Sequence, residues 1–84
     1  MSAMPTPESI RAAIAEGLEC ERLDVDGDGH HWNALVVSQR FAGLPRIERH
    51  RLVYAALGDR MRQEIHALSM RTLTPEELAA AGGR

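Results

Sequence analysis

Residues 22–39 read RLDVDGDGHHWNALVVSQ, and this stretch decides the fold because it holds two strand patterns joined by a turn. In its first part Leu23 and Val25 alternate with charged residues, which is typical of a strand with one buried face. The Gly-Asp-Gly sequence that follows is a turn signal. The apolar, β-branched run over residues 32–39 then predicts a second strand. The stretch as a whole therefore predicts a β-hairpin.

The aspartates of this hairpin also resemble the opening of an EF-hand calcium loop. Asp24, Asp26, Asp28 and Gly29 match that opening in residue type and spacing. The loop needs a bidentate glutamate where this sequence has Leu35, and the residues before it run into the apolar strand. We therefore expect no calcium site and interpret the aspartates as an acidic turn.

Thr-Pro-Glu sequences predict a helix near each end of the chain. Thr6-Pro7-Glu8 supplies an N-cap hydroxyl, a proline at the first helical position and an acid in the first turn, and apolar residues follow at helical spacing. This pattern predicts a helix over about residues 7–18. Thr74-Pro75-Glu76-Glu77 forms a capping box, which predicts a short last helix.

The segment between the hairpin and the last helix predicts a helical turn, a long helix and a third strand. Gly43 and Pro45 limit residues 41–44 to one helical turn. From about residue 47 to residue 65 an apolar stripe recurs at helical spacing, through Ile47, His50, Val53, Leu57 and Met61. Residues 65–73 then alternate in polarity, with His66, Leu68 and Met70 on one face, which suits a strand.

The expected fold is α+β, in the order α-β-β-α-α-β-α. We expect a single domain over residues 1–84, with a core of about 7–80 and flexible ends at 1–5 and 80–84. Because the long helix lies between the second and third strands, it can carry the chain back for a parallel pairing. The sheet should be three-stranded and mixed, with helices on one face and the other face open.

Composition narrows the compartment and the class of partner. The net charge of −2 at pH 7 gives no global reason to expect nucleic acid, yet residues 40–62 hold six arginines against two acids, a local charge of +4. The single cysteine, Cys20, cannot form an internal disulfide. With no signal peptide and no apolar stretch of membrane length, we expect a soluble cytoplasmic protein. No nucleophile and base set is visible, so we expect no enzyme.

The four histidines each allow a structural and a ligand interpretation. His30 and His31 would face opposite sides of a regular strand, so joint metal binding requires loop geometry, and the alternative is a polar hairpin tip. His50 lies on the apolar stripe, as a partly buried helix residue or as a ligand. His66 lies where the helix ends and a strand begins, as a helix C-terminal cation, a hydrogen-bonding structural residue or an exposed ligand. The residues alone leave these alternatives open.

Several spaced motifs together resemble the BolA family. They are Val36-Val37-Ser38, Phe41-Ala42-Gly43, Arg49-His50-Arg51 with Val53-Tyr54, Ile65-His66-Ala67-Leu68 and Thr74-Pro75-Glu76-Glu77. The resemblance covers roughly residues 8–78, and the Gly-Asp-Gly-His-His-Trp hairpin is similar to that of the short-loop bacterial subgroup. It implies a fold similar to class II KH domains, in agreement with the element order above.

The resemblance also implies iron–sulfur chemistry. Family members bind monothiol glutaredoxins and share a [2Fe-2S] cluster with them, to which the glutaredoxin cysteine and a glutathione thiol supply two ligands. On this pattern His66 is one further ligand and His31 the other, with His30 as the rival of His31 because it stands where serine is usual. Cys20 lies before the first strand and is not assigned. The expected function is an adaptor for cluster trafficking.

The alternative expectation is a DNA-binding regulator of transcription and stress response. The KH-like fold, the local positive charge and transcriptional roles within the family favour it, with Arg46, Arg49 and Arg51 as the candidate contacts. The sequence leaves two further hypotheses open. One is a homodimer of the cluster-free protein through its open sheet face, and the other is an interaction domain without a metal.

Overall fold

The hairpin predicted from residues 22–39 is present. In the computed structural model, which describes residues 6–58 and 67–82, β1 (Arg22–Gly27) pairs antiparallel with β2 (Trp32–Val37). The register runs from Arg22 opposite Val37 to Gly27 opposite Trp32. The second strand ends two residues earlier than predicted, because the Ser38 hydroxyl accepts a hydrogen bond from the Arg40 N–H and opens the short helical turn η1 (Gln39–Phe41).

The third strand, β3 (Leu68–Leu73), lies parallel to β2 and completes a mixed sheet in the order β1-β2-β3. Trp32 is opposite Leu68 at one end of this pair and Val37 is opposite Leu73 at the other. The predicted alternation holds over the described part of the strand, since Leu68 is buried while the two residues at 69 and 71 are exposed. The mixed three-stranded sheet is therefore confirmed.

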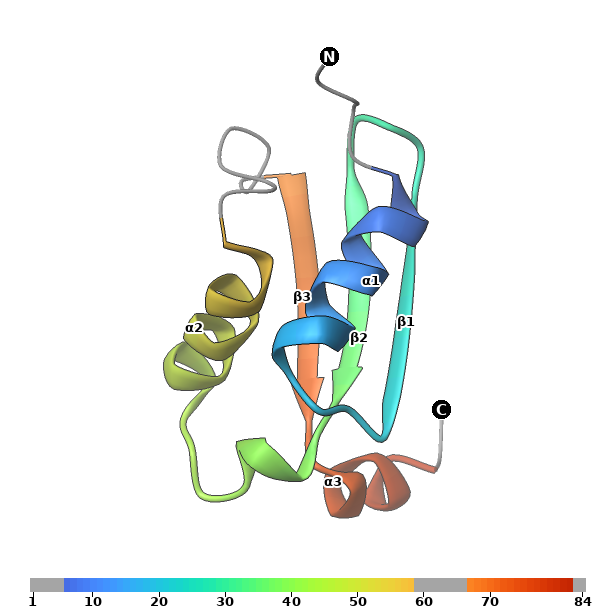
Figure 1. The fold of residues 1–84 in the computed structure, drawn as a ribbon. Helices are drawn as coiled ribbons and strands as arrows, with labels where there is room; N and C mark the ends of the chain where they lie inside the picture. The colour runs from blue at the N-terminus through green and yellow to red at the C-terminus, as the bar shows by residue number, and fades with distance from the viewer. Residues whose placement is uncertain (1–5, 59–66, 83–84) are drawn as a thin grey trace.

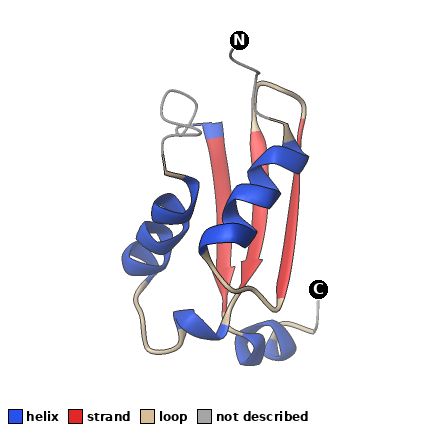
Figure 2. Cartoon of the chain, viewed as in Figure 1, coloured by secondary structure: helices blue, strands red, loops and turns tan. Residues whose placement is uncertain are grey.

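The helices follow the predicted caps. Helices α1 (Pro7–Gly17) and α2 (Arg46–Leu57) cover the same face of the sheet, and α3 (Pro75–Ala80) lies at the end where β3 finishes (Figures 1 and 2). The Thr6 hydroxyl accepts a hydrogen bond from the Ser9 N–H, and the Thr74 hydroxyl accepts one from the Glu77 N–H, each at 3.1 Å. The helical turn η1 lies at Gln39–Phe41, earlier than the predicted residues 41–44. With η1 counted as that turn, the element order agrees with α-β-β-α-α-β-α.

Helix α2 differs from its prediction in length and in its buried face. It ends at Leu57, because Gly58 adopts φ 60° and ψ −130°, a conformation that favours glycine; the predicted continuation over residues 59–65 lies outside the described residues. Ile47 was expected on the apolar stripe but is 60% exposed, whereas Val53 and Leu57 are buried. Ile47 is six residues before Val53, and at about 3.6 residues per turn this places it about 120° from Val53 around the helix axis.

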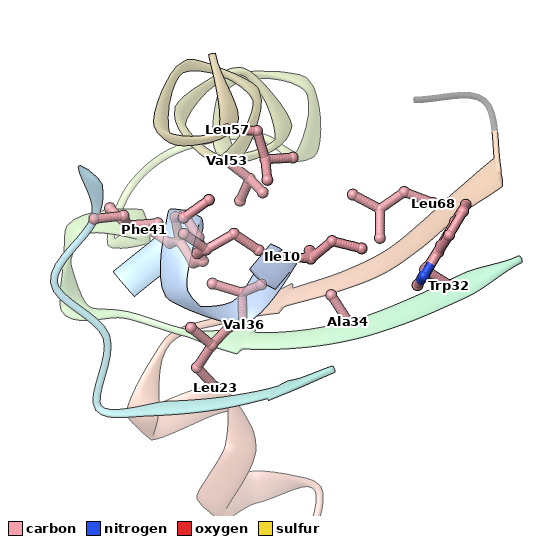
Figure 3. Packing of buried hydrophobic residues seen from close by; sticks show 12 residues of the cluster. Ile10, Leu23, Trp32, Ala34, Val36, Phe41, Val53, Leu57 and Leu68 are labelled. Carbon is pink, nitrogen blue, oxygen red and sulfur yellow. The ribbon is translucent and has the colours of Figure 1, made fainter. Parts of the chain in front are cut away.

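The core lies between this helical layer and the sheet (Figure 3). Trp32 fills it near the hairpin tip, and Phe41 fills it at the other end; both are almost completely buried. Helices α1 and α2 approach closely, since a Cβ atom on Gly17 would lie 2.7 Å from the Ala56 Cα. Across the described residues, no helix is both long and apolar enough to span a bilayer. The core cluster comprises Ile10, Ala13, Ile14, Leu18, Leu23, Trp32, Ala34, Val36, Phe41, Val53, Leu57 and Leu68.

Candidate functional site

The hairpin tip holds the backbone of His31 on both sides. The Asp28 Oδ1 atom accepts hydrogen bonds from the N–H groups of His30 (2.8 Å) and His31 (2.9 Å). The Asp28 N–H in turn donates to the His31 carbonyl at 3.1 Å. The backbone N–H of His31, and then that of His30, holds the pKa of Asp28 below its ordinary value, so the carboxylate that organises the tip stays charged.

His30 and His31 differ in how many backbone hydrogen bonds hold the residue that carries each imidazole. Both side chains are exposed, and neither ring forms a hydrogen bond to another described residue. Both backbone groups of His31 are bonded, whereas the bonds within the described residues hold His30 by its N–H alone. Gly29 precedes His30 with φ 92°, so the chain reverses just before it. Of the two rings, that of His31 therefore projects from the more rigid backbone.

His66 lies outside the described residues, and the nearest described positions are Ala67 and Leu68. Leu68 is opposite Trp32, the residue directly after His31. The chain therefore enters β3 at the same end of the sheet as the hairpin tip (Figure 1). Within residues 6–58 and 67–82, no three His, Cys, Asp or Glu side chains come close enough to hold a metal ion by themselves.

The aspartates that resemble a calcium loop do not converge in the described structure. Asp24 forms an ion pair with Arg22 at 2.7 Å, and Asp26 accepts a hydrogen bond from the Asn33 side chain at 3.3 Å. Both lie on β1, whereas Asp28 is turned into the hairpin tip, where it bonds the backbone. Asp24 and Asp26 thus interact with side chains on the strand surface and Asp28 bonds the turn, so the three carboxylates do not form one metal site in the described structure.

Trp32 packs directly behind the tip and is 1% exposed. Its indole Nε1–H is buried without a hydrogen-bond partner among the described residues. Gly27 lies against the ring, since a Cβ atom there would be 2.6 Å from Trp32 Cδ1 and 2.5 Å from the His31 carbonyl oxygen. Gly27 is thus a positioning residue for the tip that sequence reasoning treated only as part of a turn. A glycine at the end of a predicted strand, opposite an aromatic residue of the hairpin, is the signal that could have indicated close packing.

The three arginines predicted to contact nucleic acid are in different environments. The Arg49 side chain is only 13% exposed and forms a bidentate ion pair with Glu77, with Nη1–Oε1 at 2.7 Å and Nη2–Oε2 at 3.1 Å. Its other bonds go to the carbonyls of Leu44 (2.8 Å) and Thr72 (3.0 Å), so its guanidinium joins a loop, a strand and a helix. Arg46 and Arg51 are exposed, and Arg51 pairs with Glu48 at 2.9 Å.

A family model described as BolA-like protein matches residues 8–77. The chain belongs to the BolA-like family. It is 36% identical over 83 residues to human BolA-like protein 1, a match that covers 87% of this chain and 61% of that protein. It thus spans about three fifths of the BolA-like protein 1 relatives that it matches. The acid stress protein IbaG of Escherichia coli is 31% identical over 71 residues, covering 83% of this chain and 84% of that protein.

Solved structures of BolA proteins share the fold. A BolA protein homologue from Coxiella burnetii has a TM-score of 0.79 and 45% identity, covering 90% of this chain and 99% of that one. The BolA domain of SufE1 from Arabidopsis thaliana has a TM-score of 0.72 and 32% identity, covering 84% and 93%. These likenesses confirm both the predicted family and the predicted fold.

This BolA-like protein also has a groove at the end of the sheet away from the hairpin tip. The groove has a volume of about 700 Å³ and runs between the start of α2 and the end of β3. Burial, and then the charge of Arg46, lower the pKa of His50, which lines the groove and is therefore mostly neutral at pH 7. Sequence reasoning missed Arg71, which lines the groove from β3, because it was read only as one residue of an alternating strand. The lining residues are Leu44, Pro45, Arg46, Arg49, His50, Met70, Arg71, Thr72, Leu73 and Glu77.

Proposed function

We propose that this BolA-like protein is an adaptor in iron–sulfur cluster trafficking. In this role it binds a monothiol glutaredoxin and shares a glutathione-assisted [2Fe-2S] cluster through His66 and His31. The supporting observation is the hairpin tip, where an exposed His31 is held at both backbone groups beside the strand that follows His66. The proposal includes no catalytic activity of the chain itself and places the protein in the cytoplasm.

The ligand chemistry of the tip fits such a centre. Imidazole nitrogen is an established ligand of two-iron clusters, and it makes the bound centre less negative and raises its potential relative to thiolate. The described residues offer exposed imidazoles but no complete ligand set, so ligands from a partner are needed to finish the coordination. The task of this chain is then to hold one imidazole at the tip in a fixed place. His31 suits that task better than His30, because its backbone is held on both sides.

The test mixes the protein with a cluster-loaded monothiol glutaredoxin and glutathione, and follows visible absorption and circular dichroism. His66→Ala and His31→Ala should abolish or strongly reduce the spectral change of the wild-type mixture. His30→Ala and a control, His50→Ala on α2, should leave it close to wild type.

Two results would count against the ligand proposal. Either the spectrum of the glutaredoxin does not change on mixing, or the change is indifferent to His66→Ala. Loss of the change in His30→Ala with retention in His31→Ala would instead assign the tip ligand to His30.

The second candidate function is DNA-binding regulation. One relative, of Vibrio cholerae, is named DNA-binding transcriptional regulator BolA; it is 47% identical over 51 residues, covering 61% of this chain and 48% of that protein. In this chain the support is the exposed pair of Arg46 and Arg51 on α2. Arg49 contributes less to such a surface, because its guanidinium is bonded within the fold.

Fluorescence anisotropy with labelled duplex DNA at several salt concentrations tests this candidate. Binding should weaken steeply with salt, and Arg46→Ala and Arg51→Ala should each weaken it and reduce the salt slope by about 1. Binding that is absent, or that does not respond to salt, would remove the candidate.

A further inference from the structure

Among the described residues strand β3 is an edge of the sheet, and part of its outer side has backbone groups that form no hydrogen bond with another described residue. Within the described sheet it pairs only with β2, and its Leu73 carbonyl accepts from the Ser38 N–H on that inner side. The Thr72 carbonyl is reached instead by Arg49, from outside the sheet. Because backbone groups alternate along a strand that pairs on one side, Met70, two residues before Thr72, also directs its N–H and C=O outward. Arg49 therefore covers the edge at Thr72, whereas no described residue bonds the outward backbone groups of Met70.

The groove provides space along this open edge. Residues 70–73 line one wall, and residues 44–46, 49 and 50, around the start of α2, line the other. A strand added to a sheet lies about 4.8 Å from its neighbour, so an added segment would run inside the groove. Its backbone would find the outward donor and acceptor of Met70 already in place.

The charge around the groove fits an acidic segment. Arg46 and Arg71 are exposed, and neither forms an ion pair with another described residue. The carboxylate that lines the groove, Glu77, is paired with Arg49, and bonds from Arg49 and then from the Thr74 N–H lower its pKa to about 2. Local charge is therefore positive, although the whole chain carries −2.

The two free arginines lie on opposite sides of an added strand. Arg46 is at the start of α2, on the helical face, whereas Arg71 follows Met70 and directs its side chain to the open face of the sheet. Successive side chains of an added strand also alternate between these faces, so consecutive acidic residues, rather than alternating ones, would meet both arginines. Among the described residues no Phe, Tyr or Trp lines the groove, so nucleic acid bases would have only the His50 ring and the arginine planes to stack on.

We propose that an extended acidic segment of a partner protein adds to the edge of β3 at Met70, and that Arg46 and Arg71 select consecutive acidic residues in it. The groove lies at the carboxyl end of β3, whereas His31 lies at the end where β3 begins. The interaction is therefore independent of cluster binding and goes beyond the adaptor function proposed above.

The experiment uses the cluster-free full chain and fluorescein-labelled peptides of about eight residues, measured by anisotropy. Three peptides are compared: one with consecutive glutamates, one of the same composition with the glutamates at alternating positions, and one with consecutive glutamates and N-methylated backbone amides. The first should bind best, the second several-fold more weakly, and the third not detectably, because strand addition needs the backbone N–H groups. Hydrogen exchange by NMR should show that the Met70 amide becomes protected when the first peptide binds.

Charge-reversed variants locate the site. Arg46→Glu and Arg71→Glu should each weaken binding of the first peptide about five- to tenfold. The matched control Arg51→Glu, an exposed arginine of α2 outside the groove lining, should change it by less than about twofold. All three positions are exposed, so the variants should fold, and far-ultraviolet circular dichroism checks this.

Four results would each overturn the proposal. The first is that the peptide with consecutive glutamates does not bind, and the second is that Arg51→Glu weakens its binding as much as Arg46→Glu and Arg71→Glu do, which indicates general charge attraction. The third is that the N-methylated peptide binds as tightly as the unmethylated one. The fourth is that a single-stranded oligonucleotide displaces the peptide, binds more tightly and depends on the same arginines. A homodimer in sedimentation, with the Met70 amide already protected, would assign the edge to a second copy of this chain and would also overturn it. None of these results affects the cluster experiment, which is read at the opposite end of the sheet.

Discussion

The two ends of the sheet use their polar side chains in opposite ways. At the hairpin tip, one short-range carboxylate, Asp28, holds the backbone and leaves the imidazoles of His30 and His31 exposed. At the other end, Arg49 reaches Thr72 and Glu77, which are 23 and 28 residues away, and is itself bonded within the fold. Exposed histidines are thus available for a ligand at one end, whereas the central arginine of the other end is structural. An arginine in a basic sequence is a binding candidate only once its own partners are known.

The largest expected effect comes from replacing that structural arginine. Arg49→Met removes the donors to the Leu44 and Thr72 carbonyls and the partner of Glu77, in a side chain that is 13% exposed. Because partly buried carbonyls and the Glu77 carboxylate are left unpaired, we expect a loss of about 2–4 kcal/mol in the free energy of unfolding. The matched control Arg46→Met should stay within about 0.5 kcal/mol of wild type. Urea denaturation measures both, and equal values would break the comparison between a structural and a free arginine.

The next effect concerns the close packing under the hairpin tip. A Cβ atom on Gly27 would lie 2.5 Å from the His31 carbonyl oxygen, so Gly27→Ala must shift the backbone that holds His31. We expect a cost of about 1–3 kcal/mol and a weaker spectral change with cluster-loaded glutaredoxin. Gly29→Asn serves as control, because nothing lies within 4 Å of a Cβ atom there and asparagine tolerates positive φ. A cluster signal in Gly27→Ala equal to that of wild type would show that the tip needs no fixed backbone.

A smaller effect is expected at the unpartnered indole. Trp32→Phe removes a buried N–H that has no partner among the described residues, at the expense of some apolar contact. These contributions oppose each other, so the free energy of unfolding should change by no more than about 1 kcal/mol. Circular dichroism is the suitable probe, since Trp32 is the only tryptophan. A loss well above 2 kcal/mol would show that the indole donates to a group outside the described residues.

The smallest effect is a pH dependence at the Arg49 end. The hydrogen bond from Arg49, and then that from the Thr74 N–H, lower the pKa of Glu77 from 4.5 to about 2, so the stability that Glu77 contributes is fully present above about pH 4.5. It should be lost as the pH falls through about 2, when the folded carboxylate takes up a proton. Thermal unfolding between pH 2 and 5 should therefore show a steeper decline for wild type than for Glu77→Gln. Parallel curves would mean that the charge of Glu77, bonded to Arg49 and to the Thr74 N–H, adds nothing to stability.

Local features of the chain were predictable because their causes are local. The Thr6 and Thr74 caps confirm the predicted starts of α1 and α3, since a hydroxyl and an N–H three residues later need no other part of the fold. The hairpin was predictable for the same reason, because its turn and its alternation lie within one stretch. The ligands His31 and His66 were predicted from the family motifs, and both stay predictions, His66 lying outside the described residues.

Long-range features were not predictable from the pattern. Ile47 fits a helical stripe in sequence, yet the face of α2 that is buried is chosen by where the sheet and α1 lie, and that face holds Val53 and Leu57. Arg71 reads as one polar residue in an alternating strand, and only the position of α2 makes it part of a groove. Which face of a helix is buried and which residues line a groove depend on contacts between elements, and the periodicity of a single sequence does not predict these contacts.

The amino-acid sequence by itself determined the element order, the two helix caps, the hairpin and the family, because each depends on residues close together or on motifs read in line. Only the tertiary structure decided that the Arg49 guanidinium is hydrogen-bonded within the fold, that Gly27 packs against the hairpin tip and that the outer edge of β3 faces a positively charged groove. The physical reason is that hydrogen bonding, burial and free charge are properties of pairs of groups. Which pairs form is settled only when segments far apart in the chain are packed together.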